Sequence, residues 1–458
     1  MSKNSKESKN PADFTYFEAM AKGSPVVWLS NLIWGLGCFV HKQFVRGFAF
    51  LIAEVLIVRY VLSSGINNLK LLITLGELEQ QKIWDEKKCV YVYIDGDRSL
   101  VILLYGIITI AIIALGIALL IKSAKNAYVN EWLKKGGKII TDFREDVKQL
   151  FDNNLHKTLL TLPVAGVVVF TILPLVFMMC MAFTDYSIID NKLVLFNWTG
   201  LDNFKSMLSM GEGMGNTFWS VLTWTLVWAL IATFSNYFVG MFLAMLINWK
   251  EVALKKFWRF CFVLTVAVPH FVTLLIIKQM LQPEGAVNIL LRNLGLIDSA
   301  QSLPFFTDPT WARVAVLIIN LWVGVPYTLL QITGILQNIP AELYEAAKID
   351  GAGPIMTFRK ITLPYMLFVT TPYLITTFTG NVNNFNVIFL TTGGAPRVLG
   401  ETAGKTDLLV TWLYKLTIDN EYYNAGAVIG ITTFITLAIV SLLTFNLSGS
   451  NRDEEGFR

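Results

Sequence analysis

Charged residues are scarce in this sequence. Asp, Glu, Lys and Arg make up 15% of the 458 residues, whereas hydrophobic residues make up 54%. A soluble domain carries about 25% charged residues, so the composition excludes an ordinary soluble protein and predicts a polytopic membrane protein. The net charge of +4 is small, and the basic residues fall mainly in alternate loops. That distribution is typical of membrane orientation and not of a nucleic-acid-binding surface.

The sequence also has few of the residues that build redox, metal or hydrolytic sites. Its four cysteines form no CxxC pair and its three histidines show no HExxH spacing, so neither a disulfide framework nor a metal site is predicted. No GxxxxGK[ST] phosphate-binding loop is present either. If ATP drives this protein, a partner subunit binds the nucleotide.

Long apolar runs are abundant instead. About 20 apolar residues are needed to cross a bilayer, and on that measure we expect about eight membrane spans. They lie near residues 45–63, 99–121, 158–183, 217–247, 258–281, 312–336, 361–390 and 425–446. Residues 25–40 are apolar but interrupted by Gly and Ser, so we expect an interfacial segment there. The first 24 residues are polar, and no signal peptide is predicted.

Lysine and arginine are unevenly divided among the predicted loops. They crowd residues 122–157 and 250–259 and recur at Arg359 and Lys360, and these loops share one side if there are eight spans. The positive-inside rule assigns that side, and with it both termini, to the cytoplasm. The loop between the first and second spans also carries lysines, although this assignment places it outside the cell. We accept this exception because changing the assignment by one span would place residues 338–360 outside instead.

The loop at 338–360 is compact, charged and punctuated by Gly and Pro. Pro340 suits the first turn of a helix, and Gly351 suits its end because a helix often stops at a residue with positive φ. Pro354 then opens a second short helix. We therefore expect two short helices with a tight corner between two spans. An amphipathic loop lying on the membrane surface is the alternative interpretation.

The order of residues in this loop resembles the EAA signature of binding-protein-dependent ABC importer permeases. The matching residues are Glu345, Ala346, Ala347, Gly351, Ile361, Leu363 and Pro364. The resemblance implies an all-α polytopic membrane protein with the type I ABC importer permease fold, whose EAA coupling helices dock on a cytoplasmic ATPase. It also implies that this chain binds no cofactor, since partner ATPase subunits hold ATP and Mg²⁺.

Two predicted spans carry polar residues at helical spacing. In the sixth span they are Asn320, Gly324, Tyr327 and Gln331. In the seventh they are Thr377, Asn381 and Asn384. Amides donate and accept hydrogen bonds, as sugar hydroxyls do, and aromatic rings cover the apolar faces of pyranose rings, so the chemistry suits a neutral polyhydroxylated ligand. The alternative is hydrogen bonding between helices, worth about 0.6 kcal/mol per pair in membranes.

Motifs in the second half of the chain resemble the larger permease subunit of maltose/maltodextrin importers. They are Asn320-x-Trp322-x-Gly324-x-Pro326-Tyr327, Asn381-x-Asn383-Asn384-Phe385, Leu390-Thr391-x-Gly393-Gly394-x-Pro396 and Thr406-Asp407-Leu408-Leu409-Val410. The resemblance implies sugar contacts at Asn320, Val323, Gly324, Tyr327, Gly380, Asn381 and Asn384, and at His270 or Thr273. Gly380 stands where the family has an aromatic residue and leaves room for a longer oligosaccharide; His270 stands where it has a small polar one.

We expect four parts along the chain. Residues 1–157 hold an N-terminal cytoplasmic segment, two spans and an amphipathic cytoplasmic linker. Residues 158–447 form the permease core with six spans, and within it residues 338–360 form the EAA coupling loop. Residues 448–458 form a cytoplasmic tail.

The resemblance implies a non-catalytic permease subunit that translocates maltose or malto-oligosaccharides across the bacterial plasma membrane. Its implied partners are a second permease subunit, two ATPase subunits and an external sugar-binding protein. Membrane lipid surrounds the spans, and no nucleic-acid partner is expected. Another oligosaccharide or glycerol phosphate stays open as the substrate, although glycerol phosphate requires basic residues in the cavity.

Two other classes of protein fit the sequence less well. A secondary sugar transporter usually shows ionisable groups near the membrane midplane for proton coupling, and the sixth and seventh spans lack them. A membrane-embedded enzyme requires paired acids or a Ser/His set at membrane depth, and the predicted spans show neither.

Overall fold

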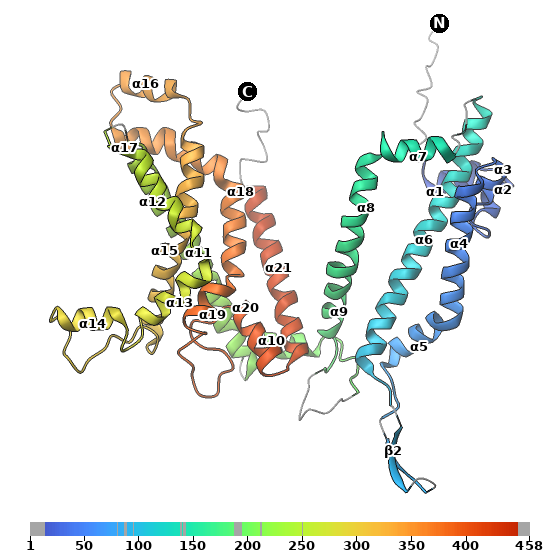
Figure 1. The fold of residues 1–458 in the computed structure, drawn as a ribbon, viewed down its shortest axis with the longest axis horizontal. Helices are drawn as coiled ribbons and strands as arrows, with labels where there is room; N and C mark the ends of the chain where they lie inside the picture. Colours follow the sequence, from blue (N-terminus) through green and yellow to red (C-terminus); the bar gives the residue numbers. More distant parts are fainter. Residues whose placement is uncertain are drawn as a thin grey trace. The chain divides into compact units, whose positions relative to one another are not determined.

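The computed structural model describes residues 14–79, 81–86, 89–94, 96–137, 140, 143–186, 195–210, 213–249 and 251–447. Its contacts divide the chain into two compact units, Met1–Thr199 and Gly200–Arg458 (Figure 1). The expected tail at 448–458 lies outside the described residues, as does Lys250 of a basic loop. The boundary expected after residue 157 falls within the first unit, and the division drawn from the sequence stays a prediction.

The first unit consists of membrane-length helices, several short helices and one hairpin. Its helical elements are α1 (Tyr16–Lys22), α2 (Pro25–Leu29), α3 (Leu36–Val40), α4 (Phe44–Tyr60), the π-helical turn η2 (Val61–Gly65), α5 (Ile66–Thr74), α6 (Ser99–Lys135), α7 (Phe143–Phe151), α8 (Leu155–Val167), η3 (Val168–Ile172) and α9 (Leu173–Met181). Residues 25–40 form only α2 and α3, which are too short to cross a bilayer. They pack on α6, where the Gly35 N–H donates to Ser123 Oγ at 2.8 Å.

Helix α6 continues well beyond the span predicted at 99–121. It runs to Lys135 as one helix, so the linker expected from residue 122 is helical at its start. Contacts within this helix and with the segments before it stabilise the extension. Glu131 bonds both Lys135 Nζ, at 2.6 Å, and the backbone N–H of Ser24, at 3.1 Å. The ring of Phe14, beside α1, also packs edge-on against Tyr128 with centroids 5.2 Å apart.

The first loop contains a hairpin that the sequence interpretation missed. Strands β1 (Gln81–Asp85) and β2 (Val90–Ile94) pair antiparallel, with Trp84 opposite Tyr91. Their rings meet edge-on at 4.9 Å. Aromatic and β-branched residues favour strands, and this pattern was the available signal in an otherwise all-α chain.

The second unit contains both predicted polar faces and the whole EAA loop. Its helical elements are α10 (Asp202–Leu208), α11 (Met214–Asn248), α12 (Lys255–Ala267), α13 (His270–Met280), α14 (Ala286–Asn293), α15 (Pro309–Leu336), α16 (Ala341–Ile349), α17 (Pro354–Thr357), η4 (Phe358–Thr362), α18 (Leu363–Val382), α19 (Phe385–Thr391), α20 (Leu409–Tyr414), η5 (Lys415–Asp419) and α21 (Tyr423–Leu447). Within the described residues, seven helices are long and apolar enough to cross a membrane, or eight if one bent pair is a single span. The expected number of about eight is confirmed on that count.

The span expected at 258–281 consists of a bent pair of helices. Helices α12 and α13 meet at an angle of 89°. Pro269 precedes α13 and has no N–H to donate, and the residue before a proline is pushed out of the helical region. Val268 accordingly is extended, with φ −77° and ψ 128°. The run at 361–390 is also interrupted, because α18 ends at Val382 and α19 begins at Phe385.

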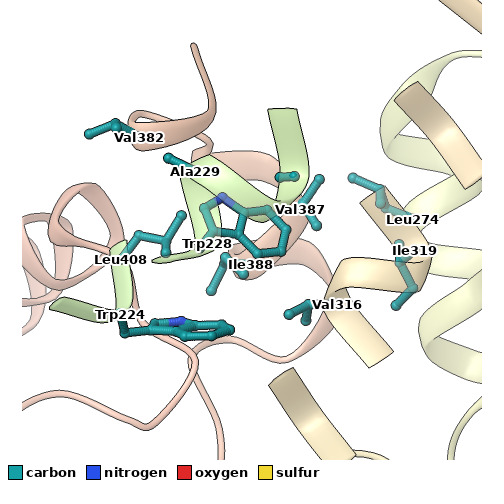
Figure 2. Close-up of a cluster of buried hydrophobic side chains, with 11 residues drawn as sticks. Trp224, Trp228, Ala229, Leu274, Val316, Ile319, Val382, Val387, Ile388 and Leu408 are labelled. Carbon is teal, nitrogen blue, oxygen red and sulfur yellow. The ribbon is translucent and has the colours of Figure 1, made fainter. Parts of the chain in front are cut away.

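Helix α11 is the centre of the second unit. Trp224 and Trp228 project from it into a cluster of buried side chains, shown in Figure 2. The other labelled members come from α11, α13, α15, the α18–α19 region and the segment before α20: Ala229, Leu274, Val316, Ile319, Val382, Val387, Ile388 and Leu408. Trp228 is fully buried, and its Nε1–H donates to the backbone carbonyl of Asn381 at 3.0 Å. This core therefore fixes the break between α18 and α19 against α11 and α15.

Candidate functional site

A cavity of about 170 Å³ opens where the bent pair α12–α13 meets α15. It is lined by Thr265, Val268, His270, Thr273, Trp322, Val323, Pro326 and Tyr327. Four of the nine predicted sugar-contact residues, His270, Thr273, Val323 and Tyr327, are thereby brought together. The bend at Pro269 explains the arrangement, since it sets the first turns of α13 beside α15. Tyr327 is 49% exposed, so its ring is accessible from the cavity.

The predicted asparagines do not line this cavity. Asn384 Nδ2 donates to Asn320 Oδ1 at 3.3 Å, which links α19 to α15. Asn381 Nδ2 donates to Thr233 Oγ1 at 2.9 Å, which links α18 to α11. Asn384 Oδ1 also accepts from the Val387 N–H at 3.3 Å and so caps α19. In this conformation the asparagines make the interhelical bonds of the alternative interpretation.

Further residues meet between the same helices, and we call the whole group the polar seam. It consists of Thr233, Asn236, Tyr237, Asn320, Gly324, Thr328, Thr370, Tyr373, Asn381 and Asn384. Two of its contacts were missed from the sequence. Tyr237 and Thr370 hydroxyls lie 2.8 Å apart between α11 and α18, and Thr328 and Tyr373 hydroxyls lie 3.1 Å apart between α15 and α18. The available signal for the first of them was the recurrence of polar residues on one face of the apolar run at 217–247, which contains Tyr237.

Gly324 and Gly380 have different surroundings. Gly324 lies against Asn236 of α11, with no room for a side chain. Gly380 is exposed, and nothing lies within 4 Å of the position that a Cβ would take. The space at Gly380 is compatible with the expected room for a longer ligand.

The EAA loop has the local structure that its Pro and Gly residues predicted. Helix α16 begins after Pro340, Gly351 has a φ of +74°, and α17 begins at Pro354. Both helices lie at one end of the second unit, and α10, α14 and α20 lie at the other (Figure 1). The two short helices and their tight corner are therefore confirmed.

The surface of the EAA loop is apolar as well as charged. Ile349 is 86% exposed and Ile355 is 77% exposed, and Glu345 and Ala346 are exposed beside them. The later signature residues Ile361, Leu363 and Pro364 join the loop to α18 through η4 and the first turn of that helix. Tyr344 of α16 bonds Thr362 of η4 at 3.1 Å, so α16 is tied directly to the base of α18.

The run from Thr406 to Val410 forms a buried charged network and not a part of the cavity. Asp407 accepts hydrogen bonds from Lys415 Nζ at 2.6 Å, from the Gly404 N–H at 2.6 Å and from Thr411 Oγ1 at 2.9 Å. The sequence analysis singled out this run but did not identify Lys415 as its partner, since nothing in the spacing of the two residues indicates an ion pair. Among the described residues, no group of three or more His, Cys, Asp or Glu side chains is arranged to hold a metal ion.

Residues 236–449 match the family described as binding-protein-dependent transport system inner membrane component. The chain is 32% identical over 432 residues to the galactooligosaccharides transport system permease protein of Bacillus subtilis, covering 94% of this chain and 99% of that one. It is 33% identical over 429 residues to the maltodextrin transport system permease protein of Streptococcus pneumoniae, covering 91% and 94%. It is also 39% identical over 256 residues to the maltose/maltodextrin transport system permease protein of Escherichia coli, covering 55% and 49%.

A solved structure supports the fold. A chain of a bacterial ABC transporter involved in the import of the acidic polysaccharide alginate superimposes with a TM-score of 0.55 at 20% identity, covering 68% of this chain and all of the other. The chain has the type I importer permease fold that was expected. It belongs to the family of binding-protein-dependent transport system inner membrane components, as a multi-pass, non-catalytic permease subunit of an ABC importer.

Proposed function

We propose that this chain is the translocating subunit of an importer for neutral oligosaccharides of the maltodextrin type. The observation that carries the proposal is the chemistry of the cavity between α13 and α15. Among the described residues that line it, none is Asp, Glu, Lys or Arg. Trp322 and Tyr327 offer rings, and His270 and Thr273 offer neutral hydrogen-bonding groups.

The same chemistry argues against charged substrates. Glycerol phosphate and acidic polysaccharides are anions. Because burying an unpaired anion is energetically costly, a site for them requires cationic side chains beside the substrate. Relatives whose names specify maltodextrin and galactooligosaccharides support a neutral oligosaccharide. Since both classes of sugar are represented among those relatives, galactooligosaccharides are the second candidate substrate.

The proposed partners follow from the family and from the EAA loop. A binding-protein-dependent system includes an external solute-binding protein, and we propose a second permease subunit and two ATPase subunits that hold ATP and Mg²⁺. The exposed apolar residues Ile349 and Ile355 suit a docking contact with a soluble subunit. We also propose that this loop and both termini face the cytoplasm.

Coupling would pass from the EAA loop to the sugar site along α18. The Tyr344–Thr362 bond ties α16 to the base of α18, and Asn381 lies near the far end of that helix. A displacement of α16 by an ATPase would thus act on the polar seam, where Asn381 bonds Thr233. In this proposal the seam closes and reopens around the substrate as the spans alternate access.

Reconstituted transport tests the proposal. The complete complex, with its ATPases and binding protein in proteoliposomes, should import labelled maltotriose when ATP is supplied. Unlabelled malto-oligosaccharides of graded length should compete, and galactooligosaccharides in a parallel series separate the two candidate substrates. Import of glycerol phosphate with no import of either sugar class would refute the proposal.

A further inference from the structure

Asn236 of α11 packs against the backbone of α15 at Gly324. A Cβ at residue 324 would lie 2.5 Å from Asn236 Nδ2 and 2.8 Å from its Cγ, so only glycine permits this approach. Asn236 is 5% exposed. Val323 and Tyr327, which flank Gly324 along α15, both line the cavity. The Asn236 amide therefore meets α15 at the turn that carries the cavity wall.

Two buried polar atoms flank this contact without a hydrogen-bond partner. They are Asn236 Oδ1, an acceptor, and Asn320 Nδ2, a donor. Asn320 lies four residues before Gly324 on α15, which is about one helical turn, and it is also 5% exposed. Its other side-chain atom, Oδ1, already accepts from Asn384. Buried polar groups are nearly always satisfied, so this unpaired acceptor and donor require an explanation.

We propose that Asn236 is a sugar-binding residue that acts together with Asn320, an inference that rests on the proposed function. A sugar hydroxyl both donates and accepts hydrogen bonds. Sugar hydroxyls can therefore donate to Asn236 Oδ1 and accept from Asn320 Nδ2, which satisfies both atoms. Because the two partners are neutral amides, the pair selects a neutral hydroxyl over a carboxylate or phosphate, which cannot donate to Oδ1.

The hydroxyl reaches this pair in another conformation of the transporter. Both atoms are buried in this structure. Asn236 lies against the backbone at Gly324, so there is no space for a hydroxyl between α11 and α15 at this contact. A shift of α11 against α15 opens the contact, and alternating access requires the spans to move. Asn236 thereby adds a residue of α11 to the predicted contact residues, which lie on α13, α15, α18 and at the start of α19.

Direct sugar binding tests the assignment. The purified complete complex in nanodiscs is held with ATP bound by a substitution in the ATPase subunits, and its Kd for labelled maltotriose is measured by equilibrium binding. We expect Asn236→Ala to raise the Kd about tenfold, as the loss of one buried hydrogen-bond partner implies. Asn236→Ser retains a hydroxyl and should recover part of the affinity.

A matched control lies next to Asn236 on α11. Ser235→Ala removes only a hydrogen bond within α11, from Ser235 Oγ to the Ala232 carbonyl at 3.5 Å, and should leave the Kd unchanged. If both Asn236 variants keep the wild-type Kd and only lower the amount of complex, Asn236 is a packing residue and the inference is wrong. If the wild-type complex neither imports nor binds any neutral oligosaccharide, the proposed function fails, and this inference fails with it.

Discussion

Asp407 and Lys415 form a fully buried ion pair with a separation of 2.6 Å between Oδ2 and Nζ. The Asp407 side chain is 0% exposed and that of Lys415 is 7% exposed. Asp407 also bonds the Gly404 N–H and Thr411 Oγ1, so its charge is shared among several donors. Gly394 lies directly against the pair, since a Cβ there would collide with both side chains. The network fixes the segment between α19 and α20.

Removing either charge of this pair should destabilise the protein strongly. Asp407→Asn leaves the Lys415 ammonium buried without its counter-ion, and Lys415→Met does the reverse. Breaking a buried pair costs about 3–5 kcal/mol, so we expect either variant to lower the thermal unfolding midpoint of the purified complex or to prevent its assembly. The double variant should recover most of the loss, because neither charge is then left unpaired.

A surface pair provides the control for this measurement. Lys405 and Glu401 lie 2.9 Å apart in the segment before α20, four residues from each other, and both are partly exposed. Lys405→Met should cost only about 0.2–1 kcal/mol. An equal loss of stability in Lys405→Met and Lys415→Met would contradict the importance of burial.

Tyr327 should contribute to transport through its ring. Tyr327→Ala removes an aromatic wall of the cavity, and we expect uptake per assembled complex to fall about tenfold, since an aromatic contact is worth on the order of 1.5 kcal/mol. Ile318→Ala is the matched control, because Ile318 lies on the same helix, is 59% exposed and does not line the cavity. Equal uptake by the two variants would count against the cavity as a sugar site.

Asn381 and Asn384 should differ in what their loss affects. Both Asn→Leu variants should reduce uptake per assembled complex by about tenfold or more, because buried sugar hydroxyls would lose partners worth about 1–3 kcal/mol. Asn381→Leu should also lower the amount of complex, since Asn381 is buried and bonds Thr233. Normal uptake per complex in both variants would show that the asparagines only join helices.

The corner of the EAA loop should be sensitive to the conformation of one glycine. Gly351 has a φ of +74°, which proline cannot adopt. We expect Gly351→Pro combined with Glu345→Ala to abolish sugar-stimulated ATP hydrolysis while the protein still inserts. Gly353→Ala is the control, because Gly353 has a φ of −71° and open space around it. Retained stimulation in the Gly351 variant would remove the loop from the coupling path.

Thiol labelling should report the orientation of the chain. Single cysteines at Lys135 and Lys348, both exposed, should be protected from an impermeant reagent in intact cells. A cysteine at Lys205, whose side chain is 75% exposed, should react. The native Cys89 is exposed and must be replaced first. Labelling at Lys348 from outside would reverse the proposed topology.

Several features were determined by the sequence alone, and they are all local. The number of spans follows from the length of apolar runs, because about 20 residues cover the bilayer. The bounds of α16 and α17 follow from Pro340, Gly351 and Pro354, since Pro and Gly restrict or release the backbone where they stand. The family could be named from the same short signature.

The tertiary structure alone decided which side chains meet. Pro269 was visible in the sequence as a helix breaker, but that His270 and Tyr327 line one cavity depends on how α13 packs against α15. Helical spacing placed Asn320 and Asn384 each on a face, whereas their partners come from other helices. Lys415 was indistinguishable from a surface cation until Asp407 was seen beside it. Such pairings depend on the depth and crossing of helices far apart in the chain, and no local pattern encodes either quantity.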